Sequence, residues 1–273
     1  MKRLAIHSPP RSGSTWLGSI FDSHPSVVYK HQPLFSYAFK DYLGFDSSKE
    51  DIQVFFSEIA SVQDDFLDRT KQKKAGVYPE FEKSSTEAVV YKEVRYHHLL
   101  NYLLAIDPEL QAIGLIRNPI DTIHSWLSIP KEFDPSWDPL EQWEYAPKRN
   151  QGRPEEYFGY QKWKEVAWMF CYLSEAYSDR FISITYESLN DDPINTARAL
   201  FSFVGLNWNA QTEDFLGKST STASNATYGV YREKKKSYRY ADQLQPAIKQ
   251  AILKDPDFEI LCDIYGWDLN ALE

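Results

Sequence analysis

The fold of this chain is decided by Leu4-Ala5-Ile6-His7-Ser8-Pro9-Pro10-Arg11-Ser12-Gly13-Ser14-Thr15-Trp16-Leu17. An apolar, strand-like run passes into a short polar loop, and an amphipathic helix then begins. Such a loop points backbone N–H groups and hydroxyls at one place, where the helix dipole also favours negative charge. Gly13 allows close approach of the backbone, and Arg11 adds a permanently charged guanidinium suited to phosphate or sulfate oxygens. The stretch therefore predicts an anion-binding loop, although an ordinary strand-to-helix turn has the same outline.

The composition predicts one acidic domain over residues 1–273. The formal net charge is −9 and the isoelectric point is near 5.3, which argues against a general nucleic-acid or membrane-surface binder. Met1-Lys2-Arg3 leads directly into the first strand, and no apolar run of about eighteen residues occurs. Cys171 and Cys262 fit buried structural thiols in a reducing compartment. We therefore expect a cytoplasmic protein without stable membrane insertion.

Strand and helix signals alternate along the chain, which is typical of an α/β domain with three layers: a central, mostly parallel sheet between two layers of helices. Strands are expected at 4–7, 27–29, 88–92, 111–116 and 181–186. Helices are expected at 15–23, 33–43, 51–67, 96–106, 120–127, 161–177 and 192–205, and from about 245 to the end with a break at Asp255-Pro256. The polar stretch 70–86 is expected to be a loop.

Two further segments have no steady period. Residues 129–158 hold five prolines and two tryptophans, with Trp126 just before them, and we interpret them as an inserted loop on the acceptor side of the site. Residues 218–240 are rich in Ser, Thr and Asn and are a possible nucleotide-covering loop. The basic cluster 232–239 within them, which includes Arg232, contacts an anion or is simply a solvated face.

A second strand-loop-helix unit reads Arg117-Asn118-Pro119-Ile120-Asp121-Thr122-Ile123-His124-Ser125. Pro119 suits the first turn of a helix, and Asp121 is expected to cap or brace that helix. The first loop does not fit the common phosphate motif Gly-x-x-x-x-Gly-Lys-Ser/Thr, because it has one glycine and its cation precedes that glycine. A magnesium-dependent kinase or other phosphotransferase is therefore the second choice.

The pair of motifs resembles the sulfotransferases that use 3′-phosphoadenylyl sulfate (PAPS). The resemblance continues through Ile184-Thr185-Tyr186-Glu187-Ser188-Leu189 and Phe203-Val204-Gly205-Leu206, and covers most of the chain up to about Leu206. It is closest to carbohydrate-type and bacterial members. It implies PAPS as donor, adenosine 3′,5′-bisphosphate (PAP) as product, no metal, and a P-loop-like site after the first strand.

The resemblance also implies roles for individual residues. Arg117 and Ser125 bind the 3′-phosphate, Trp16 stacks on adenine, and Tyr186 lines the base pocket. Arg232 lies beyond the resemblance, and only the charge of its cluster makes it a candidate nucleotide-binding residue. The first loop holds the 5′-phosphosulfate through Arg11, Ser12, Gly13, Ser14 and Thr15. Sulfuryl transfer develops negative charge on the leaving oxygen, so Arg11 is also expected to act in catalysis. Lys92 is a second catalytic cation or a lysine that faces water.

A base must remove the proton from the acceptor hydroxyl. His31 follows the second strand, where glycan-acting relatives usually present a glutamate, and a neutral imidazole near its ordinary pKa suits this role. Activity should then fall on acidification through about pH 6 to 7. Glu93 is the alternative base, and His31 could instead only order its loop.

The acceptor is expected to bear a hydroxyl group. A carbohydrate or another polyhydroxylated molecule is favoured, because aromatic side chains of the insert suit sugar rings. A phenol or small alcohol is the alternative, and no nucleic-acid partner is expected. A nucleotide-binding protein without chemistry is the third class of function.

Overall fold

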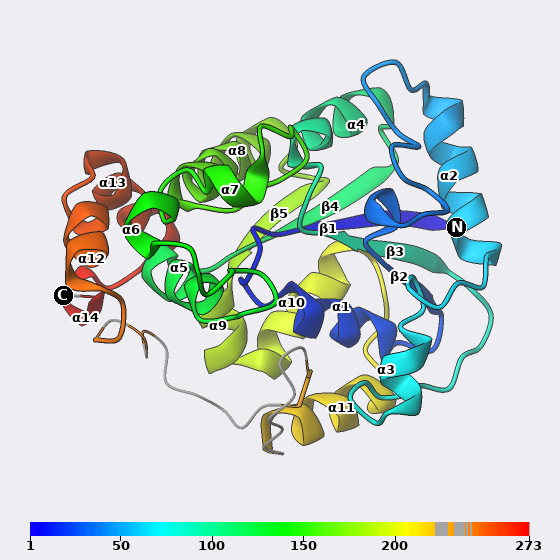
Figure 1. The fold of residues 1–273 in the computed structure, drawn as a ribbon. Helices are drawn as coiled ribbons and strands as arrows, with labels where there is room; N and C mark the ends of the chain where they lie inside the picture. The colour runs from blue at the N-terminus through cyan, green and yellow to red at the C-terminus, as the bar shows by residue number, and fades with distance from the viewer. Residues whose placement is uncertain (222–228, 232–237, 239, 241, 273) are drawn as a thin grey trace.

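The described part of the chain builds one sheet of five parallel strands, in the order β2-β3-β1-β4-β5 (Figure 1). The structure is a computed structural model, and it describes residues 1–221, 229–231, 238, 240 and 242–272. The strands are β1 (Lys2–His7), β2 (Val27–His31), β3 (Ala88–Glu93), β4 (Leu110–Ile116) and β5 (Phe181–Thr185). The parallel α/β prediction is thereby confirmed. All five carboxyl ends meet at one edge, which is where parallel sheets place their binding sites.

The strands are buried on both faces, as apolar runs in a parallel sheet should be. Ala5 of β1 belongs to one core, whereas Leu4 and Ile6 belong to the other. The first core is covered by α2 (Lys49–Ser61), α4 (Leu100–Ile106), α5 (Pro119–Leu127), α8 (Tyr160–Ala176), α12 (Pro246–Leu253), α13 (Pro256–Tyr265) and α14 (Leu269–Leu272). The second is covered by α1 (Ser14–Asp22), α9 (Tyr186–Asp191), α10 (Pro193–Phe203) and α11 (Ala210–Ser221). Figure 1 shows α4 and α8 on one side of the sheet and α1, α10 and α11 on the other.

Prolines with a capping residue before them begin several helices. Asn118 accepts a hydrogen bond from the Asp121 backbone N–H at 2.8 Å, immediately before Pro119 opens α5. Asp192 and Asp255 cap α10 and α13 in the same way. A proline at the first helical position loses no hydrogen bond, and the capping oxygen satisfies one of the exposed N–H groups. The predicted break at Asp255-Pro256 is therefore confirmed as a helix start.

Several predicted elements are wrong in extent or kind. The helix predicted over 33–43 is only a 3₁₀ turn, Pro33–Phe35, because the Ser36 hydroxyl donates to the Pro33 carbonyl that a longer helix would use. The helix predicted over 51–67 ends at Ser61, and the strand predicted over 181–186 ends at Thr185. The predicted loop 70–86 contains α3 (Thr70–Lys74), and α11 was not predicted.

The predicted insert, residues 129–158, contains the short helices α6 (Pro139–Gln142) and α7 (Pro147–Asn150) rather than loop alone. Cys262 is buried as expected, but Cys171 is only half-buried, with its Sγ 3.5 Å from the Tyr265 hydroxyl. No described helix has the length and apolar composition needed to cross a membrane. The possible covering loop 218–240 lies mostly outside the described residues.

Candidate active site

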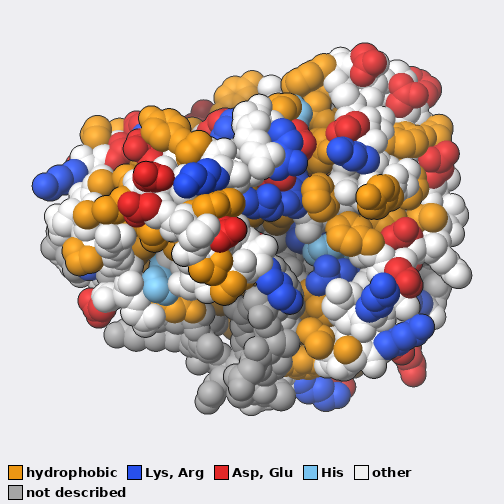
Figure 2. All heavy atoms as spheres, viewed as in Figure 1, with side chains coloured by type: hydrophobic (Ala, Val, Ile, Leu, Met, Phe, Trp, Pro, Cys, Tyr) orange, Lys and Arg blue, Asp and Glu red, His pale blue; other side chains and the backbone are white. Residues whose placement is uncertain are grey.

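A cavity of about 400 Å³ opens at the carboxyl edge of the sheet. Residues from both strand-loop-helix units line it, together with Lys131, Glu132, Arg149 and Phe158 of the insert. Lys and Arg side chains gather around this hollow, although the whole chain is acidic (Figure 2). Among the described residues, seven cations line it: Arg11, Arg69, Lys92, Arg95, Arg117, Lys131 and Arg149. The acidic protein therefore concentrates positive charge at one place, which favours an anionic ligand.

The first loop packs tightly against Tyr186, at the start of α9. Gly13 has φ +95°, and a Cβ built on it would lie 2.5 Å from the Tyr186 ring. Only glycine fits this position without moving that ring. Gly13, Ser14 and Thr15 line the cavity at the N-terminus of α1, whereas Ser12 is buried behind them. The loop thus presents the amino end of a nine-residue helix to the cavity.

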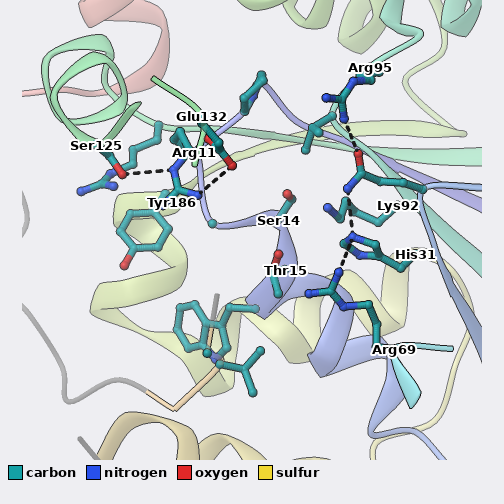
Figure 3. A pocket seen from close by; sticks show the side chains of 18 of the residues that line it. Arg11, Ser14, Thr15, His31, Arg69, Lys92, Arg95, Ser125, Glu132 and Tyr186 are labelled. Carbon is teal, nitrogen blue, oxygen red and sulfur yellow. Dashed lines mark hydrogen bonds and ion pairs between the residues drawn. The ribbon is translucent and has the colours of Figure 1, made fainter. Parts of the chain in front are cut away.

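Arg11 joins the two predicted motifs. Its Nε donates to the Ser125 hydroxyl on α5 at 3.3 Å, and its guanidinium lies 3.5 Å from the Glu132 carboxylate of the insert (Figure 3). Its backbone has φ 72°, which is unusual for a residue with a side chain. The loop conformation and these two contacts together hold the guanidinium at the cavity wall.

Arg117 stands at the end of β4 and is buried. It donates to the Asp121 carboxylate at 2.5 Å, so Asp121 braces this arginine as well as the helix. Its guanidinium lies 4.7 Å from the centre of the Tyr186 ring, and its Nε has no hydrogen-bond partner among the described residues. A buried N–H without a partner is costly, so a ligand oxygen at this position would stabilise the site.

A buried carboxylate fixes the loop that carries Arg117. Glu187 accepts hydrogen bonds from the Asn118 amide at 2.7 Å and from the Trp267 indole at 3.0 Å. Burial raises the pKa of Glu187, while the nearby Arg117 opposes that rise. The ends of β4 and β5 are thus tied to the C-terminal region.

Trp16 and Tyr186 form an aromatic corner beside the first loop. Both line the cavity, and their rings meet edge to face with centroids 6.4 Å apart. The Trp16 indole donates to the Ser219 hydroxyl on α11 at 3.1 Å. This corner offers flat apolar faces next to the anion loop, as a nucleobase requires.

His31 lies on the opposite side of the cavity in a chain of hydrogen bonds (Figure 3). Its Nε2 faces the Gln32 amide nitrogen at 2.9 Å and the Arg69 guanidinium at 3.1 Å, and the Gln32 amide oxygen accepts from Arg95 at 3.0 Å. Since Gln32 and Arg69 both donate to Nε2, that nitrogen is the acceptor and the proton is assigned to Nδ1. Burial, reinforced by nearby cations, lowers the pKa of His31 well below its ordinary value.

Lys92 and Glu93 end β3 beside His31. Lys92 lines the cavity, whereas the fully buried Glu93 does not, and its Oε1 accepts from the Leu34 backbone N–H at 2.9 Å. Burial lowers the pKa of Lys92 to about 7 and raises the pKa of Glu93 to about 8. Perturbed groups of this kind are typical of catalytic sites.

The structure brings most of the predicted site residues to one cavity. Ser12 and Glu93 are buried next to it, and Arg232 lies outside the described residues. The sequence analysis missed Arg69, Arg95, Glu132 and Arg149, because each belongs to a segment without a motif and reaches the cavity only through the tertiary fold. Among the described residues, no cluster of three or more His, Cys, Asp or Glu side chains is arranged to hold a metal ion.

Comparisons with known proteins agree with the fold and the motifs. A sulfotransferase from Alicyclobacillus acidocaldarius superposes with a TM-score of 0.58 at 14% identity, covering 100% of this chain and 98% of that one. A mouse sulfotransferase complexed with PAP superposes with a TM-score of 0.55 at 13% identity, and the match covers 98% of this chain and 89% of that one. The sulfotransferase domain of a Synechococcus olefin synthase superposes with a TM-score of 0.51 at 16% identity, and the match covers 97% of this chain and 94% of that one.

Among curated proteins, none matches the sequence significantly. The model of the sulfotransferase family matches residues 4–210, which is most of the chain and contains both motifs. This chain therefore belongs to the sulfotransferase family, and its activity is sulfuryl transfer.

Proposed function

We propose that this enzyme transfers the sulfuryl group of PAPS to a hydroxyl group of an acceptor and releases PAP. The observation that carries the proposal is the meeting of both motifs at one cavity, where Arg11 lies 3.3 Å from Ser125. The PAP held by the mouse sulfotransferase supports the same donor. A phosphotransferase remains second, because the first loop lacks the lysine and second glycine of the common phosphate motif.

The groups at the cavity fit a nucleotide with phosphates at both ends of its ribose. The amino end of α1 and Arg11 suit the 5′-phosphosulfate, and the unpartnered Nε of Arg117 suits the 3′-phosphate. Trp16 and Tyr186 lie beside both and offer their rings to adenine. Ser125 lines the same cavity and accepts a hydrogen bond from Arg11.

In this proposal the chain stabilises an in-line displacement at sulfur. The acceptor oxygen forms a bond to sulfur while the bond from sulfur to the phosphate oxygen of PAPS breaks, and that oxygen gains negative charge. Arg11 and the loop N–H groups supply fixed positive charge to it. Lys92 supplies a second cation to the sulfuryl oxygens.

The proton of the acceptor hydroxyl needs a base. His31 is the first prediction from the sequence and Glu93 the second, but two donors occupy Nε2 of His31, and Glu93 does not line the cavity. We propose Glu132 instead, because its carboxylate lines the cavity beside Arg11. His31 then acts as a positioning residue for Arg69 and Gln32.

The acceptor class is a proposal as well. A carbohydrate or other polyhydroxylated molecule is favoured by the sequence, with a phenol or small alcohol as the alternative. The insert's Trp137 and Trp143, on which the carbohydrate prediction partly rests, pack against the core, and the rings from this side of the cavity are Phe35, Phe66 and Phe158. A cytoplasmic location also stays a prediction.

Radiolabelled PAPS tests the activity directly. The protein should transfer labelled sulfate to at least one member of a panel of sugars, phenols, alcohols and hydroxy acids, and the rate should be the same in EDTA. Tight PAP binding without transfer to any member would instead identify a nucleotide-binding protein without chemistry. Transfer that requires magnesium and ATP would identify a phosphotransferase.

Replacing Arg117 by alanine should weaken PAP by about tenfold to a hundredfold, and AMP, which lacks the 3′-phosphate, by much less. A charge-assisted arginine–phosphate contact contributes on the order of 1.5 to 3 kcal/mol. Calorimetric titration measures both affinities. Since the substitution leaves the Asp121 carboxylate without its arginine, Arg117→Ala combined with Asp121→Asn is the folding control. Equal weakening of both nucleotides would refute the 3′-phosphate assignment.

The pH dependence should report the charge of Lys92. Burial, together with the nearby Arg69 and Arg95, lowers its pKa to about 7, although Glu93 and Glu132 act in the opposite direction. The lysine is thus charged below about pH 7 and neutral above it, so kcat/KM for PAPS should fall as the pH rises through about 7. Lys92→Arg, which stays charged, should remove that fall. A rise through pH 7 in the wild-type enzyme would instead make neutral Lys92 a base.

A further inference from the structure

We propose that the acceptor carries an anionic group, a carboxylate or a phosphate, near the hydroxyl that receives the sulfuryl group. The inference rests on the proposed function and concerns the arginine wall, which we define as Arg69, Arg95 and Arg149. These residues precede α3, follow β3 and lie on α7, respectively. Three separate parts of the chain thus bring a guanidinium to the same cavity.

Within the described residues, the arginine wall has fewer acidic ion-pair partners than positive charges. Glu156 is buried and lies 3.1 Å from Arg95, 3.9 Å from Arg149 and 3.7 Å from Arg153. One carboxylate therefore serves three guanidinium groups. Arg69 forms no ion pair among the described residues, and its hydrogen-bond partners are the neutral His31 and the Tyr78 hydroxyl at 3.0 Å. Positive charge left over in a partly buried site is unfavourable until an anion binds.

Arg149 and Arg69 also have N–H groups without an acceptor in the described structure. The guanidinium of Arg149 donates no hydrogen bond within the described part of the chain, and its Nε is buried. The Nε of Arg69 is also buried without a partner. Buried N–H groups without acceptors are uncommon because they cost free energy, and anionic oxygens satisfy them best.

Phenylalanine rings hold two of the guanidinium groups in place. Arg95 lies 3.9 Å from the centre of the Phe35 ring, and Arg149 lies 4.4 Å from the centre of the Phe158 ring. Stacking on a ring orients a guanidinium plane and leaves its N–H edges available for a carboxylate or phosphate. The arrangement therefore favours an acceptor with an apolar or ring portion next to its charge.

The phosphates of the sulfuryl donor PAPS do not account for the positive charge of the arginine wall. In Figure 3, Arg69 and Arg95 lie across the cavity from Arg11, Ser125 and Tyr186, with Ser14 and Thr15 between the two sides. Arg11 and Arg117 already face the two phosphate positions of the donor. The arginine wall is thus left for the acceptor.

Matched acceptor pairs test the inference in the PAP-saturated protein, where no transfer takes place. The pairs are 4-hydroxyphenylacetate with its methyl ester, glucuronate with glucose, and glycerol 3-phosphate with glycerol. Calorimetry should show that the anionic member of at least one pair binds about tenfold or more tightly than its neutral partner. The carboxylate and phosphate pairs distinguish the two kinds of anion. Equal or weaker binding of the anionic members, or no binding by any of them, would overturn the inference.

Variants that remove a charge test which arginines cause the preference for anionic acceptors. Arg149→Gln and Arg69→Gln should each reduce the ratio of anionic to neutral affinity to within about threefold, while Arg149→Lys should retain part of it. Arg153→Gln is the matched control, because Arg153 shares Glu156 but does not line the cavity, and it should keep the wild-type ratio. A preference that survives both cavity variants would overturn the assignment. If the wild-type protein did not bind PAP at all, that result would refute the proposed function instead.

Discussion

Replacing Arg11 by alanine should lower the turnover of sulfuryl transfer by about a hundredfold or more, and the affinity for PAP by much less. The guanidinium faces an oxygen that becomes more negative as the bond from sulfur to the leaving phosphate breaks, so its contribution is largest in the transition state. Single-turnover kinetics at saturating PAPS measures the chemical step. The Ser125 hydroxyl and Glu132 hold the side chain for this role.

Two further variants separate charge from backbone effects at this position. Alanine at φ 72° adds backbone strain, so Arg11→Gly removes the same side chain without that strain and should show the same loss of turnover. Arg11→Lys keeps a charge but not the planar fork, and should be intermediate. Weaker PAP binding with unchanged turnover in Arg11→Gly would reduce Arg11 to a binding residue.

Replacing Glu132 by glutamine should lower turnover by about a hundredfold or more with acceptors whose hydroxyl is weakly acidic, because general-base catalysis commonly contributes this much. The variant keeps the size of the side chain and removes its ability to take a proton. An acceptor that is already ionised, such as 4-nitrophenolate, needs no base. The loss of turnover should therefore be much smaller with that acceptor.

His31→Ala and Glu93→Gln are the comparison variants for this assignment. His31→Ala should mainly raise KM for the acceptor, because it releases Arg69 and Gln32. The low pKa of His31 also means that His31 itself gives no acid limb near pH 6 to 7, since it stays neutral there. If His31→Ala or Glu93→Gln lost turnover a hundredfold while Glu132→Gln kept near-normal turnover, the affected residue would be the base instead.

Local sequence patterns predicted the parallel sheet and the two loops that face the cavity. Leu4, Ala5 and Ile6 alternate between the two cores, which is why an uninterrupted apolar run reads correctly as a strand buried on both faces. Before α5, Asn118 caps the helix and Pro119 begins it, so this loop follows from neighbouring residues. Before α1, the local signal is Gly13, which takes the positive φ that the helix start requires.

The other side of the cavity depends on tertiary contacts that no local pattern encodes. Leu34 donates its backbone N–H to Glu93, fifty-nine residues away, so a distant residue fixes the turn that follows β2. Arg69 and Arg149 come from a helix edge and an insert with ordinary surface composition. Their role emerges only when the sheet edge brings them beside His31 and Phe158.

The central claim is that this cavity binds the donor nucleotide of sulfuryl transfer, and titration of PAP into the protein in EDTA tests it most directly. Calorimetry should show one saturable site, with AMP at least about tenfold weaker because it lacks the 3′-phosphate. PAPS should compete for the same site. Absence of PAP binding, together with ATP binding that requires magnesium, would contradict the claim and favour a phosphotransferase.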